Sequence, residues 1–185
     1  MRDRSQAAAR QYARALVGLA EQRGGDEPLR LRGELRQLGT LVERHPELRA
    51  ALEHPGVDPE SRRRVLVAIA ESGGASELLT RLVGLLGTRD HVHLLPAIAE
   101  IYAALVNASR GIVPAEVMGA VPLTQKQERA LAEALKGTTG GELELTAKVD
   151  PRVLGGLRVT MGGKTYDGTV RGRLAALRRT LASGS

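Results

Sequence analysis

The sequence predicts a mixed α and α/β fold, in which an N-terminal six-helix bundle precedes a small α+β domain. Through the first hundred residues, apolar side chains recur at the 3.6-residue spacing of amphipathic helices. After Gly111, apolar and polar side chains alternate, as they do in half-buried strands. The chain has 185 residues, which allows one domain or two small ones. We therefore predict a helical domain over 1–107 and an α+β domain over 108–185.

Turn and capping residues divide the first domain into six helices. The first is expected over 5–22, because apolar residues recur there at helical spacing and Gly24-Gly25 follows. A fourth helix should begin at Asp58-Pro59, where the carboxylate can accept from free backbone N–H groups and proline fits the first turn. The fifth is expected over 76–87, and Pro96 marks the first turn of the sixth. The other boundaries are Asp26–Pro28, His45-Pro46 and Ser72–Gly74.

The second domain is predicted to contain a short sheet with a hairpin and two helices. Thr124 and Gln127 have capping-box spacing and should begin the first of these helices. Gly162-Gly163 has the composition of a two-residue hairpin turn. Alternation predicts strands over 142–149 and 157–161, and 164–167 should return from the hairpin as the partner strand. The segment 112–118 alternates poorly, but its β-branched residues predict a strand. In the last helix, Val170, Leu174, Leu177 and Leu181 should face inward, and Arg171, Arg173, Arg178 and Arg179 outward.

The sequence lacks the residue patterns that several kinds of catalytic and metal site require. The chain has no cysteine, and its four histidines show no metal-ligand spacing. Gly163-Lys164-Thr165 resembles the end of a phosphate-binding loop, but the first glycine of that motif is replaced by Arg158 and the loop lies between strands. No serine stands in a nucleophile elbow. We predict no catalytic, cofactor-binding or metal-binding residues.

Charge and amphipathicity leave two kinds of partner open. The formal net charge is +6, and arginine supplies most of the positive charge. Arg62-Arg63-Arg64 and the C-terminal arginines could contact phosphates, although such runs usually form a solvated helix face. The helices over 5–22 and 76–87 are apolar on more than one side. Such a helix is either deeply buried or holds another helix.

Several segments, taken in order, resemble the delta subunit of F-type ATP synthase, whose mitochondrial relative is the oligomycin-sensitivity-conferring protein. The most specific are VDPRVLGG at 149–156 and YDGTVRGRL at 166–174. The others are QYARAL at 11–16, His54-Pro55 with RRRVL at 62–66, LVGLL at 82–86, and LLP at 94–96 followed by Ile98. One departure is His91, which stands where the family usually has an arginine.

The resemblance implies a non-catalytic stator subunit of a proton-translocating ATP synthase, present once per complex. The helical domain would bind N-terminal helices of the alpha subunits of the catalytic head, with the beta subunits as further candidates. The groove residues would be Tyr12, Ala15, Leu19, Leu79, Leu82, Val83 and Leu86. The second domain would bind the peripheral-stalk b subunits through Gly155, Gly156, Asp167, Gly168, Thr169, Arg171 and Leu174, of which Asp167-Gly168 could equally be turn and cap residues.

The same resemblance implies that the stalk holds the head against the torque of the rotor. The N-terminus shows no targeting segment, so we expect a bacterial protein at the cytoplasmic face of the plasma membrane, attached only through its complex. The alternatives are a basic two-domain nucleic-acid adaptor, which would bind in a salt-sensitive manner, and, more remotely, an enzyme.

Overall fold

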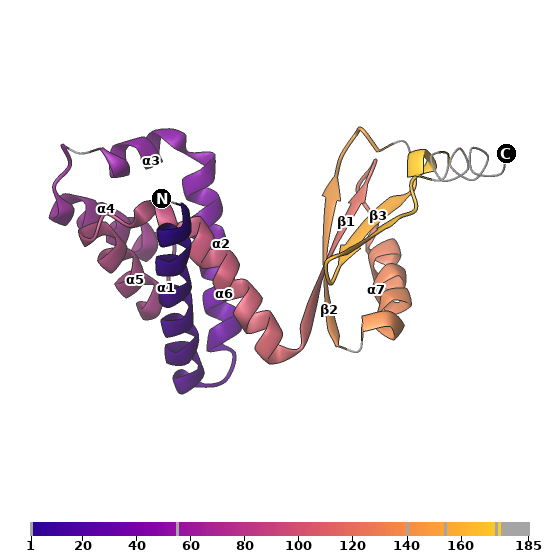
Figure 1. The fold of residues 1–185 in the computed structure, drawn as a ribbon, viewed down its shortest axis with the longest axis horizontal. Helices are drawn as coiled ribbons and strands as arrows, with labels where there is room; N and C mark the ends of the chain where they lie inside the picture. The colour runs from indigo at the N-terminus through magenta and orange to yellow at the C-terminus, as the bar shows by residue number, and fades with distance from the viewer. Residues whose placement is uncertain (1, 55, 140, 154, 173, 175–185) are drawn as a thin grey trace. The chain divides into compact units, whose positions relative to one another are not determined.

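The computed structural model describes residues 2–54, 56–139, 141–153, 155–172 and 174 (Figure 1). The chain divides into two compact units, Met1–Val106 and Asn107–Ser185. Helices make up the first unit, and strands with a covering helix make up most of the second. The predicted fold class is confirmed.

The helices of the first unit follow the predicted order closely. They are α1 (Arg2–Arg23), α2 (Glu27–Arg44), α3 (Pro46–Glu53), α4 (Pro59–Ser72), α5 (Glu77–Thr88), the 3₁₀ turn η1 (Val92–Leu94) and α6 (Leu95–Arg110). The Asp58 carboxylate caps α4 by accepting from the Ser61 N–H at 2.9 Å. The Ser76 hydroxyl caps α5 and donates to Glu34 Oε2 at 2.6 Å. Local side chains therefore fix where these helices begin.

Aliphatic side chains and one tyrosine form the core of this unit. The side chains of Leu31, Leu35 and Ile98 are completely buried, and so is that of Tyr102. The Tyr102 hydroxyl donates to the Pro28 carbonyl at 3.2 Å, which satisfies its polar group inside the core. Burial raises the pKa of Tyr102 above its ordinary range.

Among the described residues, one helical stretch is long and apolar enough to cross a membrane by length and composition alone. It covers Val92–Arg110, where η1 leads into α6, and its mean hydropathy is 1.3. Within the bundle, Ile98, Tyr102 and Val106 of this stretch are buried. About a third of this window, 33%, is buried, so the stretch packs one face against the rest of the bundle as an amphipathic helix does.

Arg62 contradicts the expectation that its run of three arginines lies on a solvated face. Its side chain is 4% exposed. It forms an ion pair with Asp90 at 3.0 Å and donates to the carbonyls of His54 and Val57. The helical period explains the difference, because three consecutive residues of α4 cannot all face solvent when one side of that helix is buried.

The second unit contains a four-stranded mixed sheet. Its elements are β1 (Ile112–Gly119), α7 (Gln125–Thr139), β2 (Glu142–Val149), β3 (Leu157–Met161) and β4 (Lys164–Asp167). The strand order is β2-β1-β3-β4, with β1 parallel to β2 through the α7 crossover and antiparallel to β3. The positive φ angles of Gly162 and Gly163 close the predicted hairpin between β3 and β4.

A small core lies between the sheet and α7. Ala115 and Val117 of β1 are buried with Val159 and Met161 of β3, and Leu131 of α7 packs against this cluster. Figure 1 shows α7 lying along one face of the sheet.

The last helix departs from its predicted orientation. It begins at Val170, and Val170 and Leu174 are 50% and 63% exposed rather than turned inward. The small sheet core is already packed against α7, so an apolar stripe does not by itself imply a neighbour to bury it. The expected inward residues Leu177 and Leu181 lie outside the described residues, as do Arg173, Arg178 and Arg179.

Candidate functional site

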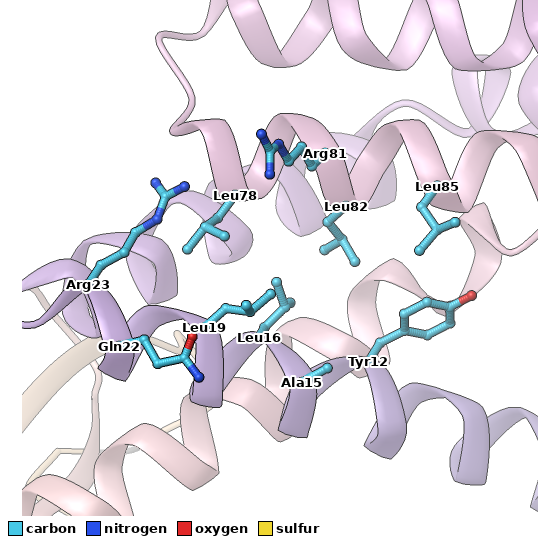
Figure 2. A pocket seen from close by; sticks show the side chains of 10 residues that line it. All are labelled: Tyr12, Ala15, Leu16, Leu19, Gln22, Arg23, Leu78, Arg81, Leu82 and Leu85. Carbon is cyan, nitrogen blue, oxygen red and sulfur yellow. The ribbon is translucent and has the colours of Figure 1, made fainter.

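An apolar pocket of about 310 Å³ lies between α1 and α5. Figure 2 shows side chains of the two helices facing one another across it. Its lining consists of Tyr12, Ala15, Leu16, Leu19, Gln22, Arg23, Leu78, Arg81, Leu82 and Leu85. We call this pocket the α1–α5 groove.

The helical period places each apolar lining residue on the groove. On α1, Tyr12, Ala15 and Leu19 are three and four residues apart, and on α5 the same spacing joins Leu78, Leu82 and Leu85. Leu19 and Leu85 are 46% and 41% exposed, although neighbouring leucines on both helices are buried. The chain thus leaves large apolar side chains on two facing helices open to solvent.

The predicted groove residues separate into two groups. Tyr12, Ala15, Leu19 and Leu82 do line the groove. Leu79, Val83 and Leu86 do not, since they are almost completely buried in the bundle core. The apolar stretch of α5 is nearly continuous, so its sequence did not separate the face toward the core from the face toward the groove. The groove face carries Leu78 and Leu85 instead.

A polar bridge starts from α1 at each end of the groove, one to α5 and the other to the turn that follows α5. Near the end of α1, Arg23 Nη2 lies 2.8 Å from Glu77 Oε2 at the start of α5. The hydrogen bond from Arg23 is the main cause that lowers the pKa of Glu77. At the other end, the Tyr12 hydroxyl is hydrogen-bonded to Nδ1 of His91 at 3.0 Å. This second bridge could not be predicted from sequence, because its partners are 79 residues apart.

The groove offers burial of apolar surface rather than acid–base or metal chemistry. Its polar lining consists of Gln22, Arg23 and Arg81 at the rim and the Tyr12 hydroxyl at one end. In the part of the chain that the structure describes, no group of three potential metal-ligating side chains is found. An elongated apolar surface between two helices suits the apolar face of a third helix.

A second candidate surface surrounds the start of the last helix. The Asp167 carboxylate accepts hydrogen bonds from the Thr169 hydroxyl and the Thr169 N–H. These bonds, with the nearby Arg158, lower the pKa of Asp167. The Thr169 hydroxyl in turn accepts from the Gly172 N–H at 3.0 Å, which caps the helix.

The predicted glycines build the turn that supports this helix. Gly155 and Gly156 have φ angles of +71° and +77°, which side-chain-bearing residues rarely adopt. A Cβ atom on Gly156 would collide with the carbonyl oxygen of Gly168. The Gly168 N–H donates to the Leu157 carbonyl, and the Val170 N–H donates to that of Gly155. The turn is therefore locked to the end of the sheet.

The residues predicted for this second surface accordingly have two roles. Thr169 is buried and caps the helix, while the turn formed by the glycines and Asp167 holds it in place. Arg171 and Leu174 are exposed. Their side chains are free of the turn that holds the helix, so a partner could contact them together with the exposed Val170.

Comparisons with known proteins agree with one another. A family profile described as "ATP synthase delta (OSCP) subunit" matches residues 8–181. The chain is 36% identical to "ATP synthase subunit delta" of Anaeromyxobacter dehalogenans over 173 residues, which covers 94% of this chain and 96% of that protein. It is 38% identical to the protein of the same name from Synechocystis over 164 residues, covering 88% and 87%.

A solved structure shares the fold. It is a chain of the Toxoplasma gondii mitochondrial ATP synthase hexamer, determined by cryo-electron microscopy. The TM-score is 0.69 with 19% sequence identity, over 94% of this chain and 97% of that chain.

Proposed function

Because this chain belongs to the ATP synthase delta (OSCP) subunit family, we propose that it is a non-catalytic stator subunit of F-type ATP synthase. In this role the N-terminal unit binds N-terminal helices of the alpha subunits, and the C-terminal unit binds the peripheral-stalk b subunits. The chain thereby links the catalytic head to the stalk. The head can then resist the torque of the rotor during proton-driven ATP synthesis. We place one copy in each complex, at the cytoplasmic face of a bacterial plasma membrane.

The α1–α5 groove is the observation that supports this proposal most directly. Leu19 and Leu85 stand exposed on opposite walls, and Leu16 and Leu82 lie deeper between them. A guest helix that presented apolar residues at three- and four-residue spacing would cover all four leucines. Burial of that surface would drive binding, since each well-buried leucine contributes roughly 1.5–3 kcal/mol.

The C-terminal unit supports the second half of the link. Val170 and Leu174 are four residues apart on one side of the last helix and are largely exposed. Arg171 lies beside them and supplies positive charge. A partner helix with an apolar stripe and acidic flanks would match this surface, which is the chemistry that we assign to the stalk contact.

Isothermal titration with a peptide of the cognate alpha subunit's N-terminus tests the proposed contact between the groove and the catalytic head. Wild type should bind saturably, with a negative heat-capacity change from apolar burial. Leu85→Asp should weaken binding by about 2 kcal/mol, close to thirtyfold in Kd, because it places an unpaired charge in an apolar contact. Val65→Asp is the matched control, since Val65 is equally exposed but lies on α4, away from the groove.

Two outcomes would contradict the proposal. One is an absence of binding to that peptide together with tight, salt-dependent binding to nucleic acid, which would favour the adaptor alternative. The other is an equal loss of affinity in Leu85→Asp and Val65→Asp. A parallel titration with the C-terminal segment of a b subunit, comparing Leu174→Asp with the exposed Val121→Asp, tests the stalk contact in the same way.

A further inference from the structure

The two bridges across the α1–α5 groove define its length. Tyr12 and Arg23 are eleven residues apart on α1, which corresponds to about 16 Å along the helix axis. Figure 2 shows Tyr12 opposite Leu85 at one end and Arg23 near Leu78 at the other. The apolar floor between them extends over about three helical turns.

The bridges differ in how firmly they hold the walls together. Arg23 and Glu77 are both solvent-exposed, and each has another ion-pair partner, Glu27 and Arg81 respectively. Exposed pairs of this kind contribute little net free energy. The Tyr12–His91 hydrogen bond is half-buried and is supported by an edge-to-face contact between the rings, whose centroids are 5.9 Å apart. It is therefore the stiffer of the two connections.

The backbone around His91 is itself fixed. Its N–H donates to the Leu86 carbonyl at 2.9 Å, and its carbonyl accepts from the Leu94 N–H at 2.9 Å. Asp90, with φ of 57°, turns the chain immediately before it. The imidazole is therefore carried on a rigid corner at the end of α5, and it fixes where the Tyr12 ring can lie.

We propose that His91 is a positioning residue for guest binding, acting through Tyr12. This inference rests on the proposed function, because it assumes that the groove receives a helix. The hydrogen bond keeps the Tyr12 ring as the end wall of the groove and out of the space that a guest would occupy. Without the bond, the ring gains rotational freedom that each binding event must remove. The groove is thus pre-organised by a residue that does not line it.

A double-mutant cycle on guest affinity tests this proposal. The probe is a synthetic peptide of the cognate alpha subunit's N-terminal segment, titrated into the full chain. Tyr12→Phe and His91→Phe should each weaken binding by roughly threefold to tenfold, since either removes the bond while keeping a ring. The double variant should bind no more weakly than either single variant, because both remove the same interaction.

Two further variants separate positioning from a general effect on folding. His91→Asn places a hydrogen-bonding group where Nδ1 stands, so it should recover most of the wild-type affinity. His45→Phe is the matched control, because His45 is an exposed histidine between α2 and α3 that does not line the groove, so this change should leave affinity unchanged. Thermal unfolding of each variant, followed by circular dichroism, establishes that the fold is retained.

The outcomes distinguish this inference from the proposed function. If wild type does not bind the peptide, the proposed function and this inference both fall. If wild type binds but the effects of the two single changes are absent or simply additive, only the inference is overturned. Should His91→Phe fail to fold, the comparison of Tyr12→Phe with wild type still decides, since unchanged affinity in Tyr12→Phe contradicts the proposal.

Discussion

Gly156→Ala should destabilise the C-terminal unit much more than the same change at the adjacent Gly155. Both glycines have φ angles near +75°, so alanine at either position costs about 1–2 kcal/mol in backbone conformation. Their surroundings differ. A Cβ atom on Gly155 would meet only the Val170 Cγ2 atom at 3.4 Å, whereas one on Gly156 would lie 2.9 Å from the Thr169 Cα and still closer to the Gly168 carbonyl oxygen. Because these last atoms are backbone, they cannot rotate away. We expect a further cost of about 2–3 kcal/mol in Gly156→Ala.

Urea-induced unfolding, combined with hydrogen exchange read by mass spectrometry, measures this difference. Peptides covering β3 and β4 should lose protection in Gly156→Ala, whereas peptides of the helical unit should keep it. Gly155→Ala is the matched control for the φ angle alone. If the two variants lose the same stability within about 0.5 kcal/mol, the close approach of residues 156 and 168 does not exist in solution and the reasoning fails.

Three further predictions concern stability. Ser76→Ala should cost about 1–2 kcal/mol in urea unfolding, because it removes the α5 cap and a half-buried hydrogen bond to Glu34. An unchanged free energy of unfolding would contradict this account. Asp90→Ala should lower the free energy of unfolding by about 1–2 kcal/mol, since it leaves the buried Arg62 cation without its carboxylate partner. An unchanged midpoint in thermal unfolding would contradict this account. The lowered pKa of Asp167 means that its stabilising contribution is present above its ordinary pKa of 3.8 and is lost as pH falls through the lowered value. Wild type should therefore exceed Asp167→Asn in stability at neutral pH, and this difference should shrink in acid unfolding experiments.

The helix boundaries could be predicted because short-range chemistry encodes them. Asp58, Ser76 and the prolines at the starts of α2, α3, α4 and α6 act within one turn, so a linear sequence contains the needed information. The hairpin at Gly162-Gly163 is encoded in the same local way. The order of the strands in the sheet could not be predicted in this way. Alternation shows which side chains face the core, but it does not show that β1 lies between β2 and β3.

The groove illustrates the limit for long-range features. Its two helices could be singled out because each is apolar on more than one side, but α5 is so uniformly apolar that Leu79, Val83 and Leu86 could not be assigned to the core from sequence. The same limit applied to Arg62 and His91. Their roles depend on contacts with Asp90 and Tyr12, which only the folded chain brings close.

The strand order has a mechanical consequence. Both β1 and β4 are antiparallel to β3, so they point in the same direction. The chain enters the sheet at Ile112 and leaves it at Asp167, which is level, through Arg158, with Met118 near the opposite end of β1. A tension applied to the chain at these two points pulls along the strands, so neighbouring strands would have to slide past one another. The hydrogen bonds of the β1–β3 and β3–β4 ladders then carry the load together, instead of breaking one after another.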